Sequence, residues 1–263
     1  MSWTIETITV ATARTPGSEV TFQRGFGEWV DIAIHCFLLR DGRHRVLVDT
    51  GLLDEIEPLN RAMRRRKGHQ AGFVRQENAL GEMLTSPLDA VVLTSFGPYA
   101  VGGIARLHPA TRLVASARGL ADLRRPEEPM LVHALPPALG ALLQDRSEPV
   151  TGAVDLLPGL TVMEVGVHHP ASMAVRLDTD DGPLVIADPV FTRANVIDGV
   201  ALGAAEHAAG WYEMVRRLAA GGARFLPIHD PSPEPVSPGA WLSGVCSSGA
   251  ENEASPKEAM HAR

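Results

Sequence analysis

The sequence predicts an α+β protein folded as an αββα sandwich. Two β-rich stretches carry the prediction, one from residue 4 to 48 and one from residue 150 to 187. Helix-like segments follow each stretch, which suits two sheets packed face to face with helices outside. The length of 263 residues fits one large domain, which we expect to span residues 1–242.

The first half supplies strands and helices in alternation. Its predicted strands are rich in β-branched and apolar residues: Thr4–Ala13, Trp29–Arg40, Arg45–Val48, Ala90–Leu93 and Thr111–Ala115. Its predicted helices are Leu52–Met63, Phe73–Leu84, Val101–Leu107 and Ala117–Leu123. Asp41-Gly42 is a hairpin-type turn, so the second and third strands should pair as neighbours.

The second half returns to short strands. They are predicted at Val150–Leu157, Leu160–Val165, Met173–Asp178, Pro183–Ile186 and Arg224–Ile228. Between the last two, Trp211, Met214, Val215 and Leu218 recur at helical spacing, and Gly221-Gly222 ends that helix. Residues 243–263 are rich in Ser, Gly and Glu, and we expect them to be disordered because they offer little apolar surface to bury.

Composition and charge exclude several classes of function. Hydrophobic residues make up 45% and charged residues 21% of the chain, as in ordinary globular proteins. The net charge of −7 argues against a nucleic-acid or anionic-membrane partner, although Arg64-Arg65-Arg66-Lys67 is a local basic run. We see no signal peptide and no apolar stretch long enough to span a membrane, so we expect a cytoplasmic protein.

The loop from Thr94 to Gly103 follows a buried strand, a position where α/β folds place chemistry. Its flanks, Thr94 and Gly102-Gly103, resemble those of the metallo-β-lactamase superfamily, whose loop reads Thr-His-x-His-x-Asp-His-x-Gly-Gly. Here Ser95, Gly97, Tyr99 and Ala100 stand at the four metal-ligand positions of that loop. None of these four is a good zinc ligand.

Further segments carry the same resemblance between residues 30 and 231. Val48-Asp49-Thr50-Gly51 is similar to the motif whose Asp supports the metal loop, and Asp49 could do so by accepting backbone N–H bonds. His168 matches one metal-binding His, Asp188 the Asp that bridges two metals, and His229 the last His ligand. The Pro227–Pro231 ending is most similar to N-acyl homoserine lactonases, in which a Tyr stands at the position of Phe191.

The resemblance implies a degenerate metal centre. Each of the two ancestral sites keeps one His and shares Asp188, whereas a stable zinc site needs three or four protein ligands. We therefore predict no cofactor and no dinuclear centre. One weakly held divalent ion at His168, Asp188 and His229 stays open as an alternative, because two His and one carboxylate form a known metal-binding set.

The remaining residues suggest an enzyme with changed chemistry. We expect a metal-independent or single-metal enzyme that acts on a small ester-, lactone- or polyketide-like molecule. His168, Asp188 and His229 would be its acid–base groups, with Tyr99 as a hydrogen-bond donor. Ser95 is a candidate nucleophile with a histidine as base. The alternative is a non-catalytic homologue that binds a small molecule or serves as a partner subunit; the oligomeric state stays open.

Overall fold

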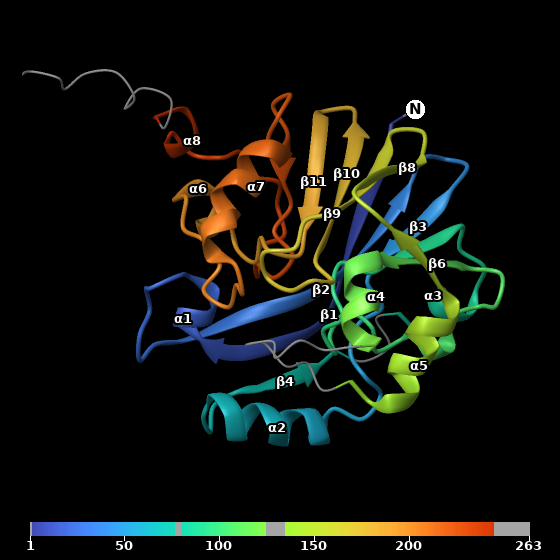
Figure 1. Cartoon of the computed structure of the whole chain (residues 1–263), viewed down its shortest axis with the longest axis horizontal. Helices are drawn as coiled ribbons and strands as arrows, with labels where there is room; N and C mark the ends of the chain where they lie inside the picture. The colour runs from blue at the N-terminus through green and yellow to red at the C-terminus, as the bar shows by residue number, and fades with distance from the viewer. Residues whose placement is uncertain (1, 77–79, 125–134, 245–263) are drawn as a thin grey trace, which may run out of the picture.

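A computed structural model describes residues 2–76, 80–124 and 135–244 of the chain, and it contains two β-sheets (Figure 1). The larger sheet has seven strands in the order β4-β1-β2-β3-β5-β6-β7. Its strands are β1 (Thr4–Pro16), β2 (Trp29–Arg40), β3 (Arg45–Val48), β4 (Gly72–Arg75), β5 (Ala90–Val92), β6 (Arg112–Ser116) and β7 (Ser147–Val150). The strands β3, β5, β6 and β7 run parallel, whereas β1 pairs antiparallel with β2 and β4.

The smaller sheet has five strands in the order β12-β11-β10-β9-β8. They are β8 (Ala153–Leu157), β9 (Leu160–Glu164), β10 (Met173–Thr179), β11 (Gly182–Ala187) and β12 (Arg224–Phe225). Apolar side chains of both sheets, such as Phe37, Leu47, Val175 and Ile186, are fully buried in the core. The predicted α+β class and two-sheet sandwich are therefore confirmed.

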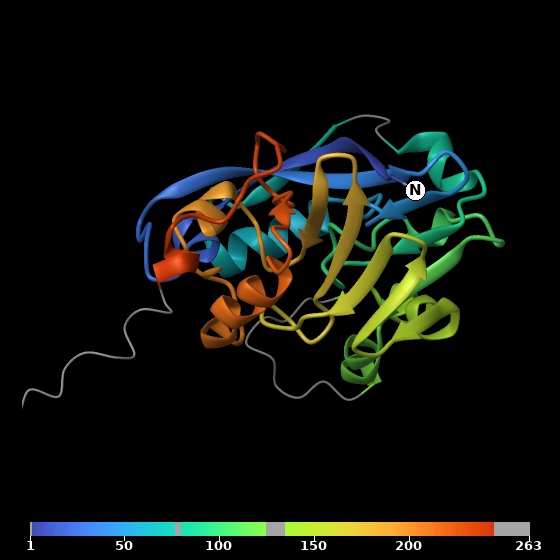
Figure 2. The ribbon, with the colours of Figure 1, turned by 90° about the horizontal axis from the view of Figure 1, so that it is seen from above.

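Helices lie outside the two sheets (Figures 1 and 2). They are α1 (Gly17–Val20), α2 (Glu57–Lys67), α3 (Gly81–Thr85), α4 (Ala117–Arg124), α5 (Pro137–Arg146), α6 (Arg193–Ile197), α7 (Trp211–Leu218) and α8 (Trp241–Gly244). Helix α2 contacts the edge strand β4, and α4 and α5 contact β7. In the described part of the chain, no helix has the length and apolar character needed to cross a membrane.

Several predicted elements differ in their bounds: the helix predicted at Leu52–Met63 is Glu57–Lys67, and the strand predicted at Arg224–Ile228 is Arg224–Phe225. Two further predictions were wrong in kind. The segment Phe73–Leu84 was expected to be one helix, but Phe73 lies in strand β4, which pairs with β1, and among the described residues of this stretch the helix is Gly81–Thr85. Pairing buries Phe73 against the core, which outweighs the local helical pattern. Likewise Val150–Leu157 is two strands, because Gly152 turns the chain from the larger sheet to the smaller one.

Hydrogen bonds between the sheets fix their relative position. The Trp3 backbone N–H donates to the Asp178 carbonyl at 2.9 Å and its indole N–H donates to the Pro158 carbonyl at 3.0 Å. At the other end, the Ala33 N–H in β2 donates to the carbonyl of His229, which follows β12. Of the predicted disordered tail, residues 245–263 lie outside the described residues.

Candidate functional site

The candidate residues follow the ends of strands. His168 lies in the turn between β9 and β10, Asp188 directly follows β11, and His229 follows β12. Ser95 and Tyr99 lie in the loop after β5. Strand ends of the two sheets meet at this edge of the sandwich, so residues far apart in sequence come together there.

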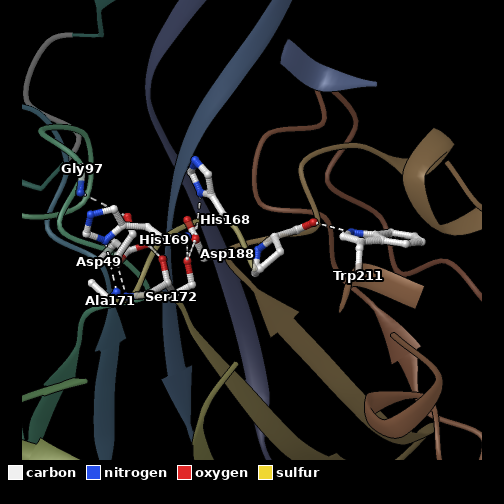
Figure 3. A network of polar contacts seen from close by, with 11 residues as sticks. Asp49, Gly97, His168, His169, Ala171, Ser172, Asp188 and Trp211 are labelled. Carbon is white, nitrogen blue, oxygen red and sulfur yellow. Dashed lines mark hydrogen bonds and ion pairs between the residues drawn. The ribbon is translucent and has the colours of Figure 1, made fainter. Parts of the chain in front are cut away.

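His168 and Asp188 form a buried pair (Figure 3). The Nδ1 atom of His168 lies 2.8 Å from Oδ2 of Asp188, which also accepts a hydrogen bond from the Ser172 hydroxyl. Burial opposes ionisation of Asp188, but His168 and these hydrogen bonds outweigh it and hold the pKa of Asp188 below its usual value. A carboxylate only accepts, so Nδ1 of His168 carries a proton, and in the neutral imidazole Nε2 is the atom with the lone pair.

The backbone around this pair is constrained. Val167 has a φ of 72°, which is a true outlier for a β-branched residue. Its carbonyl accepts the His207 N–H at 2.9 Å, and the His168 carbonyl accepts the Glu206 N–H at 3.3 Å. On the other side, the Trp211 indole N–H donates to the Pro189 carbonyl at 2.8 Å and so anchors the residue after Asp188 (Figure 3). Strain of this kind is retained where surrounding contacts enforce it.

His229 is held in one tautomer. Its Nδ1 atom lies 2.9 Å from the Ala33 carbonyl oxygen, which can only accept, so Nδ1 is the protonated nitrogen. Burial lowers the pKa of His229 to about 3, so its imidazole stays neutral near pH 7. Its Nε2 atom therefore presents a lone pair, and the ring accepts rather than donates hydrogen bonds there.

Two aromatic rings surround these histidines. The Phe191 ring meets His229 edge-on with centroids 4.5 Å apart and His168 with centroids 5.3 Å apart. The Tyr99 ring lies 5.2 Å from that of His229. The hydroxyl oxygen of Tyr99 is buried, and burial raises its pKa well above the usual value for tyrosine. The phenol is thus protonated, and its ring rather than its oxygen faces open space.

A cavity of about 380 Å³ opens above this floor. His168, His229, Tyr99 and Phe191 line it, together with side chains of β1, β2, α1, α2 and β4. The wall is mainly apolar and is formed by Ala13, Ile32, Ile34, Met63 and Phe73, with Thr15 as a buried polar neighbour. Three charged lining residues reach solvent and form the rim: Glu19, Arg66 and Lys67. A small, largely apolar cavity with a few polar groups is the usual form of a small-molecule site.

Ser95 is not part of that cavity wall as the structure describes it. It is 1% exposed, and its hydroxyl accepts the Gly97 N–H at 3.3 Å. Tyr99 does line the cavity, so a molecule bound there would contact Tyr99 rather than the serine. His169 is also buried, 3.8 Å from Asp122, and burial lowers its pKa.

Asp49 supports the loop after β5 as its motif suggests. Its Oδ1 accepts the Thr94 N–H at 2.7 Å and its Oδ2 accepts the Thr94 hydroxyl at 2.6 Å. Burial raises the pKa of Asp49 to about 8, against the effect of these hydrogen bonds. The residues of α1, α2 and β4 that line the cavity were not predicted from the sequence. The basic run at residues 64–67 was the one sequence feature that could have pointed to them.

Comparison with known proteins identifies the fold. The sequence matches no family profile and no curated protein. An N-acyl homoserine lactone hydrolase with N-hexanoyl-L-homoserine at its catalytic metal center has 17% identity and a TM-score of 0.72 over 90% of this chain and 100% of its own. AidC, a dizinc quorum-quenching lactonase, has 15% identity and a TM-score of 0.66, over 89% of each chain. The hydrolase AbOPH of the β-lactamase superfamily has 17% identity and a TM-score of 0.58, also over 89% of each.

This chain has the metallo-β-lactamase fold. At these identities the likeness establishes the fold alone, so the chemistry has to be argued from the residues present. Two of these solved structures carry metal: the N-acyl homoserine lactone hydrolase has a catalytic metal center, and AidC is a dizinc enzyme.

The residues do not suit the metal centre of the metallo-β-lactamase fold. Among the described residues, no group of three or more His, Cys, Asp or Glu is arranged to hold an ion. Nδ1 of His168 contacts Asp188 directly, and the Phe191 ring packs against the imidazoles of both His168 and His229. Oδ1 of Asp188 is buried without a hydrogen-bond partner, as a lost ligand would leave it, but one such oxygen does not make a site.

Proposed function

We propose that the chain is a metal-independent enzyme that hydrolyses a small ester- or lactone-like molecule by acid–base catalysis. The observation that carries the proposal is the buried His168–Asp188 pair at the floor of a mainly apolar cavity. A histidine oriented by a carboxylate is a well-established general base, and the cavity excludes bulk water from it.

Residues at the cavity floor can carry out both proton transfers that ester hydrolysis requires. His168 Nε2 takes a proton from a water molecule as that water adds to the ester carbonyl, and Asp188 stabilises the imidazolium that forms. When the tetrahedral adduct collapses, the carbon–oxygen bond to the leaving group breaks and the imidazolium returns its proton to that oxygen. His229, which is neutral, accepts a hydrogen bond at Nε2 and orients the water or a substrate hydroxyl.

The test is hydrolysis of a panel of p-nitrophenyl esters and γ- and δ-lactones in the presence of EDTA. We expect turnover with at least one of them, and a fall in kcat/KM of about 100-fold or more in His168→Gln, since general-base catalysis supplies roughly 10²–10⁴ in rate. N-acyl homoserine lactones should be poor substrates, because Phe191 offers no phenol to their carbonyl oxygen. His108→Gln, which changes a histidine remote from the cavity, is the matched control and should keep full activity.

A non-catalytic role is the second candidate, and one observation favours it. The Tyr99 hydroxyl is buried beside Ser95 rather than exposed in the cavity, so no side-chain donor for an oxyanion stands among the described cavity residues except at the rim. Such a protein would bind its ligand and release it unchanged. If the chain does turn over substrate in the presence of EDTA and His168→Gln keeps that activity, His168 is not the general base.

A further inference from the structure

Helix α2 concentrates positive charge beside the cavity. Between Glu57 and Lys67 it carries five basic side chains and one acidic one, a net of +4 in a chain whose net charge is −7. Glu57 pairs with Arg64 at 2.6 Å and approaches Arg61 at 4.0 Å. The last two basic residues, Arg66 and Lys67, line the cavity rim. Charge of one sign at the mouth of a cleft raises the local concentration of ligands of the opposite sign.

The rim has its own hydrogen-bonded structure. Lys67 forms an ion pair with Glu19 of α1, and the same carboxylate oxygen accepts the Thr15 hydroxyl at 2.8 Å. The Lys67 and Glu19 side chains are 25% and 27% exposed, so both remain reachable from solvent. With Arg66 beside them, the described residues of the rim include two cations and one anion, a balance that favours an anionic head group.

Polar side chains therefore line the cavity at two places, the floor and the rim. At the floor, His168 and His229 are 3% and 2% exposed, and at the rim the charged groups are partly solvated. The cavity is also lined by the apolar side chains of Ala13, Ile32, Ile34, Met63 and Phe73. A ligand that fits has an apolar body with a different polar group at each end.

We propose that Arg66 and Lys67 form a carboxylate-binding site at the cavity rim, so that the ligand is a small apolar acid. Its carboxylate lies at the rim and its ester or lactone carbonyl at the histidine floor. The assignment of the reactive end rests on the proposed function; the carboxylate site itself does not. Arg66 offers its guanidinium fork to the carboxylate, and Lys67 adds a second charged donor while Thr15 keeps its hydrogen bond to Glu19.

The experiment uses three eight-carbon probes that differ only in the head group: octanoate, octanamide and octylamine. Calorimetric titration of the full chain should give tightest binding for octanoate and weakest for octylamine. Octanoate affinity should fall at least fivefold in Arg66→Gln and in Lys67→Gln, and octanamide affinity should not change. Lys67→Arg keeps the charge and should retain octanoate binding. Higher salt should weaken octanoate alone, because the rim is partly exposed.

Arg65→Gln is the matched control, since it removes the same charge from the same turn of α2 at a residue outside the described cavity lining. The proposal is overturned if Arg65→Gln weakens octanoate as much as Arg66→Gln does, or if octanamide binds as tightly as octanoate. It is also overturned if Tyr99→Phe weakens octanoate while both rim variants leave it unchanged. The titration measures binding and needs no turnover. If the protein binds octanoate through Arg66 and Lys67 but hydrolyses no ester or lactone, the carboxylate site stands and the proposed function is contradicted.

Discussion

Folding makes His229 much harder to protonate. In an unfolded chain its pKa would be about 6.5, whereas burial lowers it to about 3 in the folded protein. Between about pH 3 and pH 6.5, His229 is therefore protonated in the unfolded chain but neutral in the folded protein. Stability from this residue is fully present above pH 6.5 and is lost as the pH falls toward 3.

We predict that this histidine makes the fold sensitive to acid. Between pH 7 and pH 5 the wild type should lose about 2 kcal/mol more unfolding free energy than His229→Gln, which cannot titrate there. The difference between the two proteins is the measure, taken from urea unfolding at each pH. Asp49, with its pKa raised to about 8, works in the opposite direction, since its stabilising proton is kept as the pH falls. Equal pH slopes for the two proteins would mean that His229 is not buried neutral.

At the scale of elements, the loop after β5 shows why part of the site could be read from sequence. The motif residues that survive there have structural tasks: Thr94 binds Asp49, and a side chain at Gly102 would overlap the backbone of Leu52. Those that changed were the ligand positions. A short motif can therefore predict a fold without predicting its metal chemistry, because folding and metal binding depend on different residues of one loop.

We predict that the purified protein contains well under one zinc ion per chain. The loop positions that would donate to metal are Ser95, Gly97, Tyr99 and Ala100, and the three donors elsewhere are not arranged as a metal site among the described residues. Inductively coupled plasma mass spectrometry of protein prepared in zinc-supplemented medium measures the stoichiometry. Two tightly held ions per chain would contradict both the fit of these residues and the proposed chemistry.

The elements that sequence analysis misjudged share a cause. Phe73 belongs to an edge strand whose partner, β1, lies about sixty residues earlier in the chain, and no local pattern reveals that pairing. The cavity wall has the same origin, since Ile32, Met63 and Phe73 come from three elements that meet only in the folded chain. Histidines in motifs were visible in the sequence; the apolar surface around them was set by tertiary contacts.

The whole molecule depends on contacts that tie one sheet to the other. Trp3 is 1% exposed and makes two hydrogen bonds across the sandwich, although it lies at the start of the chain. Such a residue couples the sheets, so that neither can open without disturbing the other. The sequence showed an early tryptophan but not its partner strand.

We predict that Trp3→Ala destabilises the entire fold by about 3–5 kcal/mol, the usual cost of removing a large buried aromatic side chain. Amide hydrogen exchange should accelerate in both sheets to the same extent, as measured by mass spectrometry. Phe26→Ala is the control: that side chain is 75% exposed, and its loss should change stability by less than about 0.5 kcal/mol. Faster exchange confined to one sheet would show that the sheets open independently.

The packing of Gly97 against Tyr99 limits the side chains that this loop can accept. A Cβ atom at Gly97 would lie 2.5 Å from Cζ of Tyr99, far inside contact distance. We predict that Gly97→Ala destabilises the protein by at least about 1 kcal/mol, and that Tyr99→Ala relieves most of that cost. Thermal unfolding of the two single variants and the double variant measures this coupling, and additive effects would contradict it. A larger residue such as histidine at position 97 would therefore need a smaller side chain at position 99, because the Tyr99 ring fills the space that the Cβ atom at position 97 would occupy.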